Sequence, residues 1–139
     1  MNIALSGYGK MGKTIEEMAL KNGHAIVAKI DNEEDWQRLE NEVKQADVVI
    51  EFSTPETAVH NIFRCFDLNI PVVVGTTGWH KQKEEIVSYC EQHQKALFYA
   101  SNFSIGVNLF FELNKHLAQV MKDYPDYHVH IEETHLRLR

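Results

Sequence analysis

Cysteine, long apolar runs and excess positive charge are all scarce in this sequence of 139 residues. The two cysteines, Cys65 and Cys90, form no C-x-x-C pair and lie in apparently helical segments, which favours reduced, buried thiols. No apolar run approaches the ~20 residues that span a membrane. With 14 Lys and Arg against 20 Asp and Glu, a net charge of −6 argues against nucleic acid or anionic membranes as partners. We see no signal peptide, and the expected location is the cytoplasm.

The residues that are present suit a folded globular protein. Hydrophobic residues make up 44% of the chain and charged residues 24%, as in ordinary globular domains. The length fits one domain, or one domain plus part of another, and suffices to bury a sizeable core.

A glycine motif follows the first apolar segment. Residues 3–5 are apolar and predict a short buried strand, and Gly7, Gly9 and Gly12 then have G-x-G-x-x-G spacing. Apolar residues recur at helical spacing over residues 11–22. A strand, a glycine turn and a helix in this order are typical of the phosphate-binding part of a dinucleotide fold.

An acidic residue lies where this fold places a ribose ligand. Asp31 ends the next apolar segment, residues 25–30, about 20 residues after Gly12. A carboxylate at this position accepts hydrogen bonds from ribose hydroxyls. The alternative is a purely structural glycine turn.

Strand-like and helix-like segments alternate along the first hundred residues. We expect strands at 3–5, 25–30, 46–52, 72–74 and 96–99, and helices at 11–22, 31–45, 55–68 and 80–94. This alternation predicts an α/β fold, a Rossmann-like doubly wound parallel sheet, over residues 1–104. A long apolar helix at 107–121 and an alternating strand at 127–134 then suggest the start of a second α+β domain over residues 105–139. The expected ligand edge is formed by the loops Gly7–Gly12, Phe52–Pro55, Gly75–Trp79 and Ala100–Ser104.

Several of these segments together resemble a known family. G-Y-G-K-M-G, E-F-S-T-P-E, V-V-G-T-T-G-W, Y-A-S-N-F-S-I-G-V-N and I-E-E-T-H occur in the order found in 4-hydroxy-tetrahydrodipicolinate reductase, formerly dihydrodipicolinate reductase. These enzymes of bacterial lysine and diaminopimelate synthesis reduce a cyclic dicarboxylate with NADH or NADPH, and many are tetramers. The resemblance therefore implies an NAD(P)H-dependent oxidoreductase, a small dicarboxylate substrate and a homo-oligomer.

The resemblance also assigns site residues. It implies pyrophosphate binding by Gly7, Tyr8, Gly9, Lys10, Met11 and Gly12, with Asp31 on the adenosine ribose. It implies a nicotinamide pocket of Phe52, Gly75, Thr76 and Thr77, closed by Ala100, Asn102 and Phe103. His135 corresponds to the first His of the family's His-His motif and is suited to protonate the reduced substrate.

The end of the sequence departs from the family pattern, which continues H-H-x-x-K-x-D-x-P-S-G-T. Leu136 replaces the second His, and Arg139 stands at the lysine position, where it is a candidate substrate-binding residue. The serine–glycine–threonine loop is missing. We therefore expect the front portion of the enzyme, able to bind nucleotide but inactive alone.

Three further interpretations remain open at this stage. Asp31 followed by Asn32 favours NADH, although Lys10 and Lys13 blur the preference and NADPH stays possible. His128, His130 and Glu132 alternate on one strand face, but no convergent fourth ligand supports a metal site. Glu51 and Glu56 are explained by helix-dipole complementarity better than by an acid–base pair.

Two other functions compete with the reductase assignment. One is another two-domain NAD-dependent dehydrogenase, and the other is a nucleotide-binding module without catalysis. Coupled binding of NADH and a dicarboxylate analogue would distinguish an enzyme from a bare module.

Overall fold

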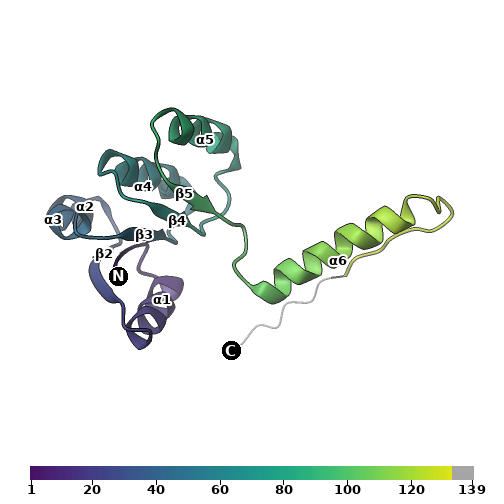
Figure 1. The fold of residues 1–139 in the computed structure, drawn as a ribbon, viewed down its shortest axis with the longest axis horizontal. Coiled ribbons are helices and arrows are strands. Elements are labelled where there is room, and N and C mark those ends of the chain that lie inside the picture. The colour runs from purple at the N-terminus through teal and green to yellow at the C-terminus, as the bar shows by residue number, and fades with distance from the viewer. Residues whose placement is uncertain (133–139) are drawn as a thin grey trace. The chain divides into compact units, whose positions relative to one another are not determined.

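A computed structural model describes residues 1–132, which form two units (Figure 1). The first unit spans Met1–Ser101, and the second begins at Asn102. The first unit contains β1 (Asn2–Ser6), α1 (Lys10–Lys21), β2 (Ala25–Ile30), α2 (Glu33–Arg38), α3 (Glu40–Val43), β3 (Val48–Glu51), α4 (Pro55–Asp67), β4 (Val72–Val74), the 3-10 turn η1 (His80–Gln82), α5 (Lys83–Gln92) and β5 (Leu97–Tyr99). The described part of the second unit contains α6 (Ile105–Met121).

The five strands form one parallel sheet in the order β2-β1-β3-β4-β5. The chain runs from β1 to β2 at the edge of the sheet, and then crosses back to β3 on the other side of β1. This reversal is the switch point at which doubly wound folds bind ligands. The predicted Rossmann-like α/β fold is confirmed.

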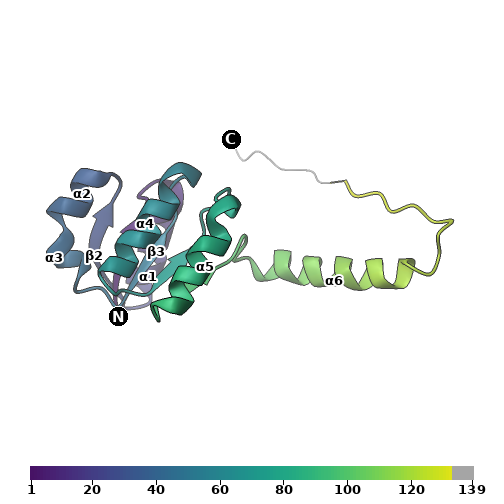
Figure 2. The ribbon, with the colours of Figure 1, turned by 90° about the horizontal axis from the view of Figure 1, so that it is seen from above.

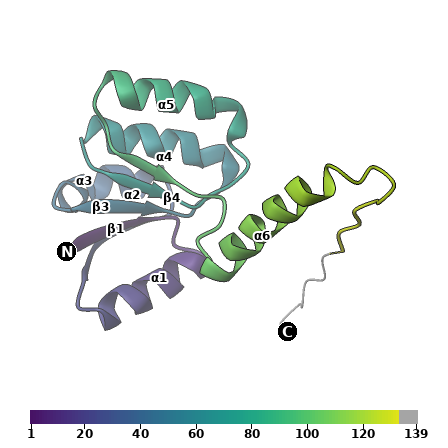
Figure 3. The same cartoon turned by 45° about the vertical axis from the view of Figure 1, so that its right-hand side comes forward.

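Alternating side chains give the sheet two apolar faces. Val49 and Val74 are fully buried on the face covered by α4 and α5, while α1 covers the opposite face (Figure 3). Figure 2 shows α4 and α5 side by side, and the rings of Phe63 and Tyr89 join them, with centroids 5.1 Å apart. The strands are therefore apolar on both faces, as buried parallel strands must be.

The helix boundaries follow local capping signals. Thr54 caps α4 and forms a capping box with Thr57, and Pro55 occupies the first turn. At the end of α1, Asn22 is the C-cap and Gly23 has a φ of 77°, a left-handed conformation that suits glycine.

Some predicted elements are wrong in detail. The single helix expected at 31–45 is two short helices that meet at Leu39; the segment is mostly exposed, with Trp36 and Val43 buried. These two side chains, which lie at helical spacing in the sequence, join the core beside α4.

The second unit departs from expectation after its helix. α6 begins at Ile105, two residues early, because Ser104 Oγ accepts from the Val107 N–H (3.4 Å). Of the strand predicted at 127–134, the described residues 127–132 are not strand. An alternating pattern becomes a strand only beside a pairing partner, and the described part of this unit supplies none.

Both cysteines are free thiols, Cys65 buried in α4 and Cys90 half-buried in α5. Burial raises the pKa of the Cys65 thiol, and the nearby Glu51 carboxylate raises it further. The thiol therefore stays protonated and behaves as a small apolar group.

Candidate functional site

Three of the four predicted loops begin at the same edge of the sheet, where the hydrogen bonds between strands continue into each loop. Main-chain N–H groups extend the strand ladder into each loop: Gly7 donates to Ile30 (2.8 Å), Phe52 to Ser6 (2.8 Å) and Gly75 to Glu51 (2.9 Å). The loop after β5 begins similarly, since Ala100 donates to Val74 (3.3 Å). The carboxyl edge of the first unit thus gathers three of the loops and the first residue of the fourth.

Each glycine of the first loop meets a different environment. A Cβ at Gly7, where φ is +90°, would overlap the Phe52 carbonyl group, and one at Gly12 would overlap the Gly7 carbonyl oxygen. A Cβ at Gly9 would meet nothing within 4 Å. Packing therefore requires glycine at positions 7 and 12, whereas the missing side chain of Gly9 leaves open space in front of the main chain.

That open space lies at the N-terminus of α1. Gly9 is the N-cap residue and provides no side-chain acceptor for the first-turn N–H groups, and the turn contains no acidic residue. Free N–H groups and the positive end of the helix dipole attract an anion. Lys10 and Met11, both exposed, begin the helix at this point. The loop fits the diphosphate of a dinucleotide.

Asp31 contacts the same loop. Its Oδ1 accepts from the Tyr8 main-chain N–H at 3.0 Å, and its own N–H donates to Oδ2 of Asp35, also at 3.0 Å. The carboxylate is thereby held at the end of β2 beside the glycine turn. The structure therefore brings together the acidic residue and the glycine motif that the sequence singled out.

The Tyr8 side chain is fixed by a charged pair. Lys29 Nζ lies 2.6 Å from Glu16 Oε1 and 3.2 Å from the Tyr8 hydroxyl, which also donates to Glu16. Hydrogen bonds from Lys29 and then Tyr8 hold the pKa of Glu16 below 4.5. In turn, Glu16 raises the pKa of Lys29 above 10.5. These contacts anchor Tyr8 between α1 and β2.

A polar hollow of about 200 Å³ adjoins Gly7 and Asp31. Glu33 and His60 also line it, and Glu33 binds both His60 Nε2 (2.9 Å) and the Arg64 guanidinium. The hydrogen bond from His60, followed by that from Arg64, lowers the pKa of Glu33. The hollow therefore presents polar groups where the ribose end of a nucleotide would lie.

Phe52 and Gly75 fit against each other across neighbouring loops. A Cβ at Gly75 would overlap the Phe52 ring, so this position needs glycine for packing. The next residue, Thr76, is only 7% exposed, and its carbonyl accepts from Trp79 Nε1 (2.7 Å). Thr77 is exposed. Three of the four residues assigned to the nicotinamide pocket, Phe52, Gly75 and Thr76, are thus held by contacts within the first unit.

The remaining predicted residues belong to the second unit or lie outside the described residues. Asn102 and Phe103 belong to the second unit, where Asn102 Oδ1 accepts from the Ser104 N–H (2.8 Å) and Phe103 is 44% exposed. His135 and Arg139 lie outside the described residues.

Glu51 lies in an environment that its sequence context does not predict. It is fully buried, and its Oε1 accepts from the Ser53 N–H (3.1 Å), the Ser53 hydroxyl and Asn61 Nδ2 (3.3 Å). Helix-dipole complementarity is therefore the wrong explanation for this residue. A carboxylate at the end of an otherwise apolar strand was the one signal available, because a buried acid needs hydrogen-bond partners.

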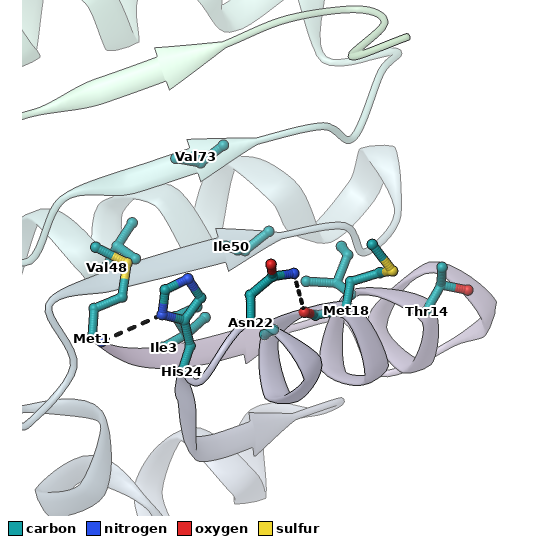
Figure 4. Close-up of a pocket in the computed structure, with 11 residues that line it drawn as sticks. Met1, Ile3, Thr14, Met18, Asn22, His24, Val48, Ile50 and Val73 are labelled. Atoms are coloured by element: carbon teal, nitrogen blue, oxygen red, sulfur yellow. Dashed lines mark hydrogen bonds between the residues drawn. The ribbon is translucent and has the colours of Figure 1, made fainter.

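A larger hollow, of about 560 Å³, lies over the face of the sheet beside α1. It is lined mainly by apolar side chains from α1 and the strands, including Ile50 and Val73 (Figure 4). Its polar groups are engaged: Asn22 Nδ2 donates to the Met18 carbonyl (2.7 Å), and His24 Nδ1 lies 3.5 Å from the N-terminal nitrogen. This hollow does not suit a diphosphate.

Two other features are absent from residues 1–132. This part of the chain contains no group of three or more His, Cys, Asp or Glu placed to hold a metal ion. It also contains no helix with the length and apolar character needed to cross a membrane.

The chain has known relatives. A family model described as "Dihydrodipicolinate reductase, N-terminus" matches residues 1–103. The 4-hydroxy-tetrahydrodipicolinate reductase of Christiangramia forsetii is 49% identical over 135 residues, covering 97% of this chain and 56% of that protein. The reductase of Rickettsia rickettsii is 39% identical over 139 residues, covering 99% of this chain and 56% of that protein. The chain spans about half the length of these curated relatives. Because the family model covers most of its residues, the chain belongs to the dihydrodipicolinate reductase family and corresponds to the N-terminal part.

Proposed function

We propose that this chain binds the reduced dinucleotide of a 4-hydroxy-tetrahydrodipicolinate reductase. The observation that carries the proposal is the open main chain at Gly9, at the uncapped N-terminus of α1, with Asp31 bonded to the same loop. In this assignment the first-turn N–H groups bind the diphosphate. The Asp31 carboxylate accepts from an adenosine-ribose hydroxyl.

The loops after β3, β4 and β5 receive the nicotinamide end in this proposal. Phe52, Gly75, Thr76 and Thr77 position the ring, and Ala100, Asn102 and Phe103 close against its ribose. The bound dinucleotide supplies a hydride, while the protein supplies orientation and charge. In the same proposal His135 protonates the reduced product and Arg139 contacts a substrate carboxylate.

NADH is the preferred dinucleotide in this proposal. Asp31, Glu33 and Glu56 all line the polar hollow, and their charges oppose a 2′-phosphate. Arg64 balances Glu33, whereas Asp31 and Glu56 form no ion pair with any residue of 1–132. A hydrogen bond from Thr54 lowers the pKa of Glu56 and keeps it charged.

Reduction of the dicarboxylate is, in this proposal, the activity of the longer reductases, of whose length the chain spans about half.

Self-association is also part of the proposal. Apolar residues of α6, among them Leu109 (66% exposed) and Leu113 (63%), are left uncovered by the described residues of their own unit.

Titration of the 139-residue protein with NADH and with NADPH, at one salt concentration, tests the assignment. We expect saturable binding of both and a lower Kd for NADH. Absence of binding would refute the nucleotide assignment, and tighter NADPH binding would refute the preference. Adding 2,6-pyridinedicarboxylate then distinguishes an enzyme from a binding module, because only an enzyme site would couple the two ligands.

A further inference from the structure

A buried carboxylate lies directly beneath the proposed dinucleotide edge. Glu51 ends β3 and is fully buried, and it pairs with Ser6 in the sheet register. Burying a carboxylate is costly unless hydrogen bonds compensate it. Here one oxygen, Oε1, accepts hydrogen bonds from the main-chain N–H and the hydroxyl of Ser53 and from the side-chain amide of Asn61.

Ser53 connects this carboxylate to the loop after β4. Its main-chain N–H, 3.1 Å from Glu51 Oε1, also lies 2.8 Å from Thr76 Oγ1. Thr76 in turn accepts from the Trp79 indole through its carbonyl. The loops after β3 and β4 are therefore joined through one shared N–H group.

Asn61 connects the same carboxylate to the segment after β2. Its Nδ2 donates to Glu51 and to Ser53 Oγ (3.1 Å), while its Oδ1 accepts from Trp36 Nε1 at 3.0 Å. Trp36 is only 3% exposed and lies in α2, which follows Asp31 in the chain. Asn61 thus fixes α2, the helix that follows Asp31, which is the residue proposed to bind the ribose.

We propose that Glu51 is a positioning residue that holds three loops of the dinucleotide edge in register. It acts through Ser53 on the loops after β3 and β4, and through Asn61 and Trp36 on the segment after β2. We call these residues, with Thr76, the Glu51 network. The proposal rests on the proposed function of this edge, because its purpose is to keep the nucleotide-binding loops preorganised.

Replacing the carboxylate with an apolar side chain removes the contacts that carry the proposed role. Glu51→Leu leaves the Ser53 and Asn61 donors without their acceptor, so the urea midpoint should fall. Under conditions where this variant is still folded, NADH binding should weaken at least about tenfold. Glu51→Gln keeps an oxygen acceptor and should bind within about threefold of the unchanged protein. The matched control is Glu84→Leu at an exposed position of α5, which should leave binding unchanged.

Hydrogen exchange reports on the Glu51 network in the absence of any ligand. Amide hydrogen exchange, read by NMR, should accelerate at Ser53 in Glu51→Leu and stay slow in Glu51→Gln. The Trp36 indole N–H should respond in the same way. If Glu51→Leu leaves Ser53 exchange unchanged, or if the folded variant binds NADH within about threefold of the unchanged protein, the positioning role is overturned.

A reciprocal pair of substitutions provides a second test, in case Glu51→Leu fails to fold. Asn61→Asp places two carboxylates in contact and should weaken NADH binding at least about tenfold. Adding Glu51→Gln restores a donor–acceptor pair and should recover binding to within about threefold. A double variant no better than Asn61→Asp would contradict the proposal. If the unchanged protein binds neither dinucleotide, the proposed function fails, while Ser53 exchange still decides whether Glu51 orders these loops.

Discussion

The Tyr8 main-chain N–H donates to the Asp31 carboxylate over 3.0 Å, joining the glycine turn to the end of β2. This bond uses Oδ1 and leaves Oδ2 for a ribose hydroxyl in the proposed complex. In this proposal the same carboxylate both stabilises the loop and binds the ligand. Changing it should affect dinucleotide binding more than folding.

Asp31→Asn should raise the Kd for NADH by about 10- to 100-fold, the cost of losing a charge-assisted hydrogen bond. NADPH should be affected less, because the substitution also removes repulsion from the 2′-phosphate. Titration calorimetry with both dinucleotides measures the two changes.

Asp47→Asn is the matched control for that substitution. Asp47 also accepts from a main-chain N–H, that of Asn2 (2.7 Å), but at the opposite end of β1. It should lower stability slightly and leave the Kd values unchanged. Equal losses of NADH binding in the two variants would argue against a ligand role for Asp31.

Gly9→Ala should separate binding from folding. The new methyl group meets no protein atom within 4 Å, so the free energy of unfolding should change by less than about 1 kcal/mol. NADH binding should weaken about tenfold or more, because the methyl group occupies the proposed path of the diphosphate.

Gly23→Ala should give the reverse pattern. Gly23 has a φ of 77° at the end of α1, so alanine should cost about 1–2 kcal/mol of stability. NADH affinity should be unchanged. Urea unfolding and NADH titration of both variants provide the comparison, and normal NADH affinity in Gly9→Ala would count against the proposed diphosphate position.

Much of the first unit could be predicted because its signals are local. The glycine spacing, the apolar strands and the Thr54-Pro55 start of α4 each depend on neighbouring residues. Alternation of these signals then determines the parallel sheet. The division of α2 from α3 was missed, because burial of Trp36 depends on contacts with α4 that periodicity does not reveal.

The interior of the candidate site was the least predictable part. Glu51 and Asn61 are 10 residues apart in sequence and meet only because α4 folds back over β3. The bond from Ser53 to Thr76 likewise depends on β3 and β4 being neighbours. Such contacts follow from topology, so the sequence gives only a weak signal for them.

The contact between Glu16 and Lys29 should depend on pH in a defined direction. Lys29 holds the pKa of Glu16 below 4.5, so the pair stabilises the fold above that value and is lost as pH falls through the lowered pKa. On the alkaline side it is lost as pH rises through the raised pKa of Lys29, above 10.5.

An NMR titration of the Glu16 carboxyl carbon measures this effect. In Lys29→Met the pKa of Glu16 should move up toward 4.5. The pKa of Glu33 should stay lowered in that variant, because His60 and Arg64 cause its shift. A Glu16 titration identical in both proteins would show that Lys29 is not the cause.

The apolar face of α6 should drive self-association. Leu113 is 63% exposed and lies among other exposed apolar side chains of this helix. Leu113→Glu should raise the dissociation constant of self-association at least about tenfold, because a carboxylate would have to be buried in the contact. Sedimentation equilibrium measures it, with Lys115→Gln as the control, and an unchanged constant would exclude this face.

The most direct test of the account is an NMR titration of the ¹⁵N-labelled protein with NADH. We predict saturable shifts of main-chain N–H resonances at Gly9, Lys10, Met11 and Gly12, with Asp31 responding at the same NADH concentrations. Shifts confined to other parts of the chain, with these amides unmoved at saturation, would contradict the account.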